Sequence, residues 1–264
     1  MKYLSTLFRS FVEGNWRLIP FAWRIPAKSV DLEGQTDKLG ASGENQLIAK
    51  PERATLQKFR YFAVLDFEAT CQPGKKRLKP QEIIEFPVML VDSTTSEVVD
   101  VFHEYVRPVV KPSLNRFCIN LTGITQKVVS EARTIGPVYD SFLQFVEQHQ
   151  LSPHNTAIVT CGDWDVKTMW PSQARLSGLK THPLFNQFIN IDKILSKYHM
   201  VSGPGMMNLL AACGLQHEGR HHSGIDDVRN IVRCLQFLLK KGTVLELTWT
   251  KEQQIPRRQR RQRR

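Results

Sequence analysis

Two carboxylates at the end of an apolar run are the residues with the clearest chemical potential. Residues 61–70 read YFAVLDFEAT, a short run without Pro or Gly that predicts a buried strand ending in a turn. Side chains alternate along a strand, so Asp66 and Glu68 are expected on the same face. Two such carboxylates repel each other and lose hydration, a cost that Mg²⁺ or Mn²⁺ would remove. An exposed acidic strand end without a metal is the alternative.

Two further acidic positions lie at comparable places. Asp165 follows a predicted strand at a strand-to-helix junction, and Asp227 lies in the first turn of the last predicted helix, five residues after His222. Sites in α/β sheets gather outside the ends of the strands. If the four carboxylates and the imidazole converge there, they describe a two-metal phosphodiester hydrolase, in which His222 takes the proton of the attacking water.

Each of these positions also has an ordinary structural interpretation. An aspartate at a helix start can cap the helix or complement its dipole, a histidine can lie on the surface, and a tryptophan can belong to the core. These alternatives apply to Asp163, Asp165, Asp226, Asp227, His221, His222 and Trp164.

The remaining pattern predicts a mixed α/β sheet, because strands come first and helices are interleaved later. Further strands are expected at 82–91, 98–107, 156–161, 188–191 and 243–249. Helices are expected from about 136, from near Asp165, and at 192–199, 205–213 and 224–240. Pro87 within the second strand suggests a bulge or an edge-facing position.

Composition narrows the class of protein. The 264 residues carry a net charge of +11, and six arginines lie in the last eight residues, which suits a polyanionic partner. The five cysteines show no CxxC or zinc-type spacing, so we interpret them as reduced thiols of an intracellular protein. No apolar run approaches the ~20 residues of a membrane span, and no membrane association is expected.

The chain divides into three predicted parts. Residues 1–57 are an arm and linker whose first 28 residues are basic, amphipathic and poor in acids, as in a mitochondrial presequence or an arm that packs on protein. Residues 58–250 have a globular composition. The tail 251–264 could contact RNA phosphates, act as a nuclear or nucleolar address, or be a solvated disordered segment.

Five motifs together resemble the DEDDh 3′-to-5′ exonucleases over about residues 58–250. More narrowly, the chain is similar to the enhanced-RNAi exoribonuclease family, which includes the histone-mRNA hairpin exonuclease and prion-interactor-like relatives. The motifs stand in the family's order: DFEAT from Asp66, EIIEFP from Glu82, FCINLTGI from Phe117, GDWD from Gly162 and GRHHSGIDD from Gly219.

The resemblance implies a ribonuclease-H-like fold, with a five-stranded mixed sheet flanked by helices. It also implies a set of functional residues and two Mg²⁺ ions, with Mn²⁺ as a possible substitute. The implied metal ligands are Asp66, Glu68, Asp165 and Asp227, the implied base is His222, and the aromatics that hold the 3′-terminal nucleotide are Phe117 and Trp164. Asp165 rather than Asp163, and His222 rather than His221, match the family's positions.

The implied function is 3′-to-5′ exoribonuclease activity that releases nucleoside 5′-monophosphates from RNA with a free 3′ end. The hairpin exonuclease carries an SAP domain that residues 1–57 do not resemble, so hairpin targeting is not expected from them. Two alternatives stay open, a DNA exonuclease and an RNA-binding module on the ribosome or another ribonucleoprotein. The nucleus, nucleolus or cytoplasm is the expected location, with the mitochondrion as the alternative.

Overall fold

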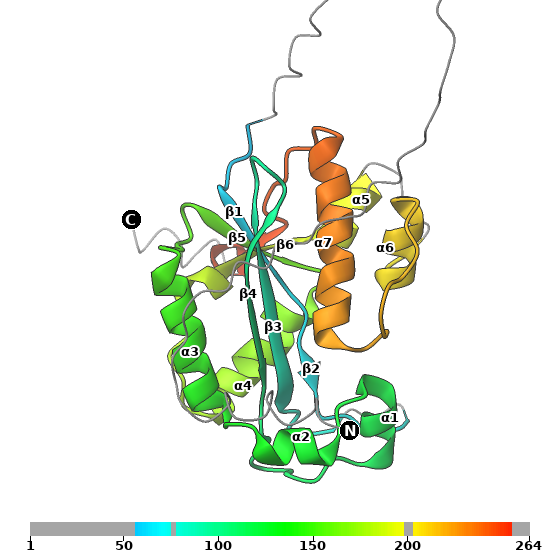
Figure 1. Cartoon of the computed structure of the whole chain (residues 1–264). Helices are drawn as coiled ribbons and strands as arrows, with labels where there is room; N and C mark the ends of the chain where they lie inside the picture. The colour runs from blue at the N-terminus through cyan, green and yellow to red at the C-terminus, as the bar shows by residue number, and fades with distance from the viewer. Residues whose placement is uncertain (1–55, 75–77, 198–202, 255–264) are drawn as a thin grey trace, which may run out of the picture. The chain divides into compact units, whose positions relative to one another are not determined.

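The computed structural model describes residues 56–74, 78–197 and 203–254 (Figure 1). These residues all belong to the second of the two units into which the chain divides, Lys50–Arg264. The predicted arm and presequence and the Arg-rich tail fall almost entirely outside the described residues. Those assignments stay predictions.

The centre of the fold is a mixed sheet. Its strands are β1 (Tyr61–Leu65), β2 (Glu68–Ala69), β3 (Ile83–Asp92), β4 (Val98–Tyr105), β5 (Thr156–Thr160), β6 (Gln187–Asn190) and β7 (Trp249–Thr250). The order is β2-β3-β1-β5-β6-β7, with β4 paired to the other edge of β3. β1, β5 and β6 are parallel, whereas β3 is antiparallel to β1, β2 and β4.

The sheet has seven strands, so the expectation of five strands is wrong in number. Five of the six strands predicted along the chain correspond to β1, β3, β4, β5 and β6. An additional strand, β2, arises because the first strand is interrupted: β1 pairs with β3 up to Leu65 and Val88, and β2 resumes pairing at Glu68 and Glu85. Pro87 lies opposite this gap, where a residue without an N–H costs the ladder no hydrogen bond.

The predicted strand at 243–249 is also wrong over most of its length. Only Trp249–Thr250 pair, as the two-residue β7 beside β6. The preceding segment satisfies its backbone differently: Leu245 N–H donates to the Gln57 side chain at 3.0 Å, and Thr248 N–H donates to the Phe188 carbonyl at 3.1 Å. Leu245 is buried without strand pairing.

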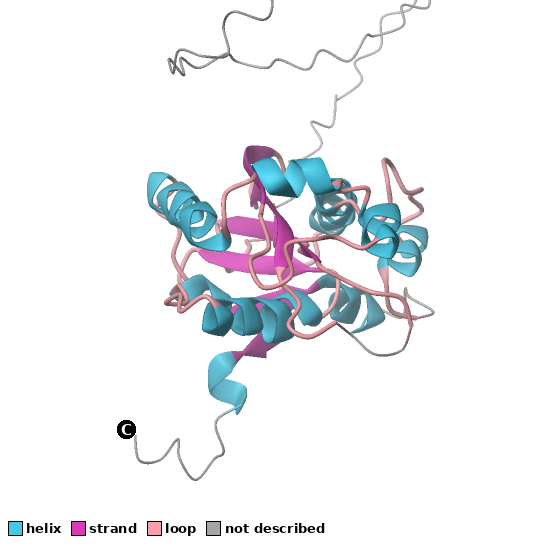
Figure 2. Ribbon diagram, turned by 90° about the horizontal axis from the view of Figure 1, so that it is seen from below, coloured by secondary structure: helices cyan, strands magenta, loops and turns pink. Residues whose placement is uncertain are grey.

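Helices cover both faces of the sheet (Figures 1 and 2). They are α1 (Arg116–Thr122), α2 (Gln126–Glu131), α3 (Ile135–Gln148), α4 (Trp170–Leu176), α5 (Ile191–Lys197), α6 (Met206–Ala212) and α7 (Gly224–Lys240). A π-helical turn at Asp165–Met169 leads into α4, and short 3₁₀ turns lie at Pro183–Asn186 and Lys251–Gln254. The predicted helices near 136, near Asp165 and at 224–240 are confirmed.

Alternate residues of β1 divide between two cores. Ala63 and Leu65 pack into an aromatic-rich core with α3 and α4, whereas Phe62 and Val64 pack into an aliphatic core with α5, α6 and α7. The sheet is therefore buried on both sides, which fixes the position of its strand ends. None of the described helices is long and apolar enough to cross a membrane.

Candidate active site

The gap between β1 and β2 holds the first two predicted acidic residues. Asp66 lies in the gap and Glu68 opens β2. Between them, the Phe67 ring is 3% exposed and packs edge-on against Phe86 at 4.8 Å between centroids. Burial of this ring turns the two flanking carboxylates away from the aromatic-rich core and holds them at the strand end.

Asp165 is tied directly to this gap. Its side chain is buried, and its Oδ1 accepts a hydrogen bond of 2.9 Å from the Phe67 N–H. The residue begins the π-helical turn after β5, the parallel neighbour of β1. Two adjacent strand ends thus bring Asp66, Glu68 and Asp165 close enough for their charges to interact.

Asp163 occupies a different environment, although it is only two residues away. Its carboxylate forms ion pairs with Lys167 at 2.6 Å and Lys193 at 2.7 Å. Partial burial opposes ionisation, but hydrogen bonds from Lys167, Lys193 and Asn190 outweigh it and lower the pKa of Asp163 to about 2. Asp163 is therefore already neutralised by protein groups.

The N-terminus of α7 is fastened to the same strand end by Glu85 of β3. This carboxylate is 1% exposed and accepts hydrogen bonds from the N–H groups of Gly224 at 2.9 Å and Ile225 at 3.1 Å. His103 Nε2 lies 2.8 Å from Glu85 Oε1, the oxygen that also accepts from Ile225. A Cβ atom on Gly224 would lie 2.9 Å from the Asp66 carbonyl oxygen, so only glycine permits this approach.

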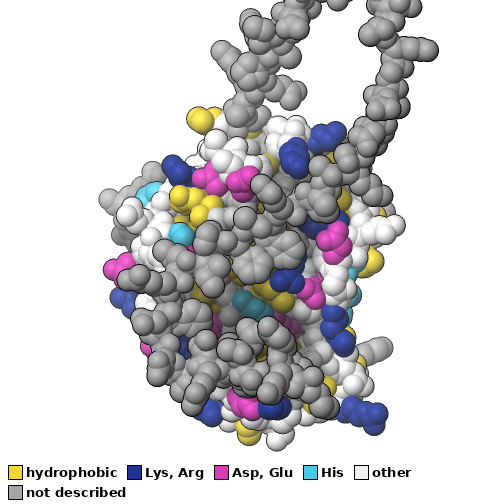
Figure 3. Space-filling view, in the orientation of Figure 1, with side chains coloured by type: hydrophobic (Ala, Val, Ile, Leu, Met, Phe, Trp, Pro, Cys, Tyr) yellow, Lys and Arg dark blue, Asp and Glu magenta, His cyan; other side chains and the backbone are white. Residues whose placement is uncertain are grey.

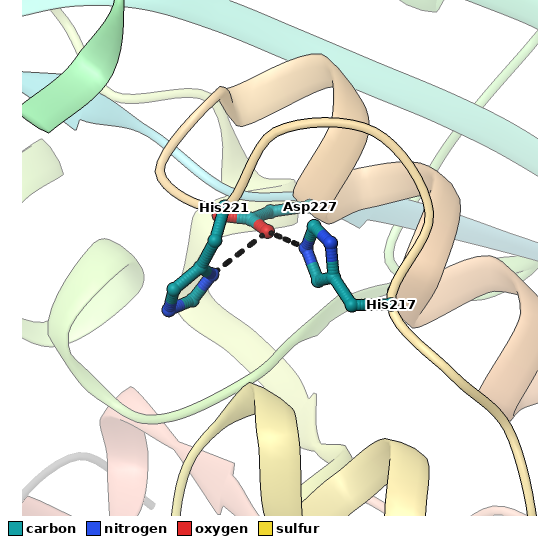
Figure 4. Close-up of side chains that lie close together, drawn as sticks. All are labelled: His217, His221 and Asp227. Carbon is teal, nitrogen blue, oxygen red and sulfur yellow. Dashed lines mark hydrogen bonds and ion pairs between the residues drawn. The ribbon is translucent and has the colours of Figure 1, made fainter.

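Asp227 lies at the centre of a cluster of histidines (Figure 4). Its Oδ1 is 3.0 Å from His217 Nε2 and 3.3 Å from His221 Nδ1, and its Oδ2 accepts a 2.9 Å bond from the His222 N–H. His222 has a φ of 65°, which turns the chain sharply just before α7. Ligand atoms of Glu68, His222 and Asp227 all lie within 4.8 Å of one another.

The carboxylates resist ionisation in the absence of a cation. Burial and the charge of Asp165 raise the pKa of Asp66 well above its ordinary value. Burial and the charge of Glu85 raise the pKa of Glu68 to about 9, and burial raises the pKa of Asp165 to about 7. Among the described residues, no Lys or Arg forms an ion pair with any of the three.

This donor set fits a divalent cation. Crowded, desolvated carboxylate oxygens that no protein cation neutralises are the ligands that Mg²⁺, Mn²⁺ and Ca²⁺ prefer. His222 adds an imidazole whose pKa is lowered by partial burial and by the neighbouring His221, against the opposing effect of Asp227. A neutral imidazole beside such a cluster can accept a proton.

A cavity of about 360 Å³ opens onto the cluster. Its lining contains Asp66, Glu68 and Asp227, together with both His221 and His222. Trp164 and Leu121 supply apolar walls from the β5–α4 junction and from α1. Phe117 lies one helical turn before Leu121 and is 40% exposed, but it is not among the lining residues.

Sequence reasoning assigned no role to three contributors to the site, although Glu85 and Arg220 stand within motifs that carry the resemblance. Glu85 and His217 act through contacts with residues distant in sequence, which no local pattern reveals. Arg220 is the third: its guanidinium donates to the Asn120 carbonyl and packs on Gly123, which ties the histidine loop to α1. Gly123 is the signal in the sequence that α1 ends there, because glycine readily adopts the positive φ of 78° that closes this helix.

A mixed α/β sheet with acidic side chains gathered at the ends of its central strands is the arrangement of a metal-dependent hydrolase of phosphate esters. Residues 63–235 match the RNase T exonuclease family, and the chain belongs to this family. The resemblance to the DEDDh 3′-to-5′ exonucleases is thereby confirmed, and membership implies dependence on a divalent metal.

Two of the similar curated proteins are exoribonucleases by name. ERI1 exoribonuclease 3 of Homo sapiens is 40% identical over 217 residues, which cover 81% of this chain and 64% of that protein. 3′-5′ exoribonuclease 1 of Mus musculus is 37% identical over 208 residues, which cover 77% of this chain and 60% of that protein. The chain therefore spans less than two thirds of these relatives.

Solved structures agree with the assignment of the fold. The nuclease domain of 3′hExo, a DEDDh family member bound to rAMP, has a TM-score of 0.69 and 35% identity, over 73% of this chain and 98% of that one. A 3′-exonuclease in a structure of 3′-end recognition of a histone mRNA stem-loop has a TM-score of 0.71 and 34% identity, over 76% of this chain and 71% of that one.

Proposed function

We propose that the protein is a metal-dependent 3′-to-5′ exoribonuclease that releases nucleoside 5′-monophosphates. The observation that carries the proposal is the cluster of Asp66, Glu68, Asp165 and Asp227 around the gap after β1, in a domain of the RNase T exonuclease family. The family names of its relatives, which are exoribonucleases, agree with it.

The four carboxylates would hold the metal, as a pair of Mg²⁺ ions with Mn²⁺ as a possible substitute. Bound divalent ions in such sites activate a water molecule and stabilise the leaving oxygen. The raised pKa values of Asp66, Glu68 and Asp165 support this role, because a cation would favour their ionised forms. Asp163, already paired with two lysines, is not needed as a ligand.

His222 would accept the proton of the attacking water. Its lowered pKa keeps the imidazole neutral near pH 7, which is the form that accepts a proton. The Asp227 carboxylate accepts a hydrogen bond from the backbone N–H of His222, and this bond fixes the turn that carries the imidazole.

The 3′-terminal base would stack on Trp164, with Phe117 closing the same end of the site from α1. Trp164 lines the cavity, and Phe117 is exposed on the helix that supplies Leu121. Aromatic faces stack on any base, each worth about 1–3 kcal/mol, so the sequence preference is expected to be weak. The nuclease domain of 3′hExo was solved bound to rAMP, which supports nucleotide binding by a domain of this fold.

RNA with a free 3′ end is the proposed substrate, as in the relative that recognises a histone mRNA stem-loop. Attachment to the ribosome or another ribonucleoprotein stays a prediction, as does an intracellular location in the nucleus, nucleolus or cytoplasm, with the mitochondrion as the alternative.

The product identifies the reaction. An RNA carrying a label in its 3′-terminal nucleotide should release that nucleotide first, as a nucleoside 5′-monophosphate, in a reaction that needs Mg²⁺. The control is the same RNA with its 3′ hydroxyl blocked by a phosphate group. A DNA of the same sequence measures the preference for ribose over deoxyribose. Release of internal fragments before the terminal nucleotide would contradict exonuclease action, and a faster reaction with DNA would reassign the substrate.

A further inference from the structure

A second and larger cavity, of about 660 Å³, lies beside the catalytic cavity. It is bounded by the segment that precedes β3 and by the π-helical turn and α4. Its walls include Leu78, Lys79, Trp164, Ser172, Arg175 and Leu176. Its volume lies within the range of ligand-binding pockets, about 300–1,000 Å³.

Trp164 lines both cavities. This half-buried side chain packs against the aromatic-rich core, and it immediately precedes Asp165. The indole is therefore a wall common to the two cavities.

The two cavities differ in charge. The catalytic cavity contains Asp66, Glu68 and Asp227, whereas the second contains Lys79 and Arg175 and has no acidic residue in its described lining. Both basic side chains are exposed, and neither forms an ion pair with another residue in the described part of the chain. Two uncompensated positive charges thus face one cavity.

On the part of the face that Figure 3 leaves visible, Lys and Arg side chains are interspersed with acidic ones.

We propose that the second cavity binds the nucleotides that precede the 3′-terminal one. This inference rests on the proposed exonuclease function. The bond to be cleaved lies on the 5′ side of the terminal nucleotide, so the preceding nucleotides must continue outward from the carboxylate cluster. Lys79 and Arg175 contact their phosphates, and the apolar wall of Leu78 and Leu176 contacts a sugar or base.

Substrates of two lengths test the assignment. The p-nitrophenyl ester of a nucleoside 5′-monophosphate fills only the catalytic cavity, whereas an eight-nucleotide RNA extends beyond it. The Lys79→Ala/Arg175→Ala variant should hydrolyse the ester as the parent does. It should bind the RNA roughly 10–30-fold more weakly at ~0.1 M salt, and the slope of log K against log salt should become shallower by about 1.4, since each single-strand phosphate contact contributes about 0.7.

A control variant separates a specific contact from general electrostatics. The Lys197→Ala/Lys240→Ala variant removes the same amount of positive charge from the C-terminal ends of α5 and α7. It should change neither the hydrolysis of the ester nor the affinity for RNA. Equal RNA affinity in the Lys79/Arg175 variant and the parent, or an equal loss in the control variant, would overturn the proposal. All melting temperatures are compared, because both targeted side chains are exposed and the fold should be unaffected.

Failure of the proposed function would look different. In that case neither the ester nor the RNA would be hydrolysed by the parent protein with Mg²⁺ or Mn²⁺. RNA affinity, measured by fluorescence anisotropy on the same three proteins, would still show whether the second cavity binds the strand.

Discussion

Asp163 and Asp165 show how the environment of a side chain separates two chemically identical residues. Asp163 is partly exposed and bound to two lysines, and its pKa falls to about 2. Asp165 is buried against the Phe67 N–H, and burial raises its pKa to about 7. The resemblance to the exonuclease family selected Asp165, and the structure supplies a physical reason for that choice.

Replacing each aspartate by asparagine tests this distinction. Asp165→Asn should lower kcat by about 100-fold or more, since a metal ligand is worth several kcal/mol and each 1.36 kcal/mol is tenfold in rate. Asp163→Asn should leave kcat within about twofold and lower the free energy of unfolding by about 1 kcal/mol or less, because its ion pairs are partly exposed. Similar losses of kcat in the two variants would refute the assignment.

His222 and His221 form a second pair of neighbours. His222→Ala should lower kcat by about 10²–10⁴-fold with RNA binding largely retained, as expected for loss of a general base. His221→Ala should have a smaller effect, because that ring contacts Asp227 at 3.3 Å and supports the carboxylate. Single-turnover kinetics measure both, and an unchanged rate for the His222 variant would exclude it as the base.

At the scale of elements, the sequence predicted the long helices and central strands well. The apolar side chains at helical spacing in α3, and the apolar runs of β1, β3 and β5, are local patterns, and these side chains are buried in the structure. The short helices α1 and α2 were missed because caps define them: Asn115 accepts from Cys118 N–H, and Thr125 from Val128 N–H. Helices this short have few turns in which to show periodicity, although the seven-residue α5 and α6 were predicted at 192–199 and 205–213.

Contacts between distant elements were beyond sequence reasoning. The Glu85 carboxylate accepts a hydrogen bond from the Gly224 N–H, which is 139 residues away in the sequence. Local sequence patterns do not identify such a distant partner. The gap between β1 and β2 was missed for a related reason. It depends on Pro87 lying opposite the gap in β3 as well as on residues 66 and 67 themselves.

Glu85→Ala tests whether this contact positions α7. The change orphans two N–H groups at the start of α7, so the free energy of unfolding should fall by about 3 kcal/mol. Glu82→Ala is the matched control, since this buried carboxylate accepts from the N–H groups of Val109, Val110 and Lys111 and does not contact α7.

Denaturant unfolding should show similar losses of stability in the two variants. Only Glu85→Ala should also lower kcat, measured well below both melting temperatures, because Asp227 is carried by α7. Equal kcat in the two variants would mean that the contact stabilises the fold without positioning the site.

At the scale of the whole molecule, the carboxylate cluster makes the metal-free protein less stable than its core allows. Burial and mutual repulsion raise the pKa values of Asp66, Glu68 and Asp165, so their ionised forms are costly in the folded state. A cation that binds only the folded protein removes this cost.

Thermal unfolding should therefore depend on Mg²⁺. At ~100 times its dissociation constant, Mg²⁺ should add about 2.7 kcal/mol, which corresponds to about 5–10 °C in Tm for a domain of this size. Asp66→Asn should raise the Tm of the metal-free protein, because it removes one repelling carboxylate. It should also reduce the increase in Tm that Mg²⁺ produces. An equal shift in the variant and the parent would place the metal elsewhere.

The most direct test of the central claim is a time course on a 5′-labelled RNA with a 3′ overhang. The parent protein with Mg²⁺ should shorten the RNA in single-nucleotide steps from its 3′ end. EDTA and the Asp66→Asn substitution should each abolish that ladder. A protein that binds the RNA but yields no ladder with Mg²⁺ or Mn²⁺, or a ladder that persists in the Asp66→Asn variant, would contradict catalysis at this carboxylate cluster.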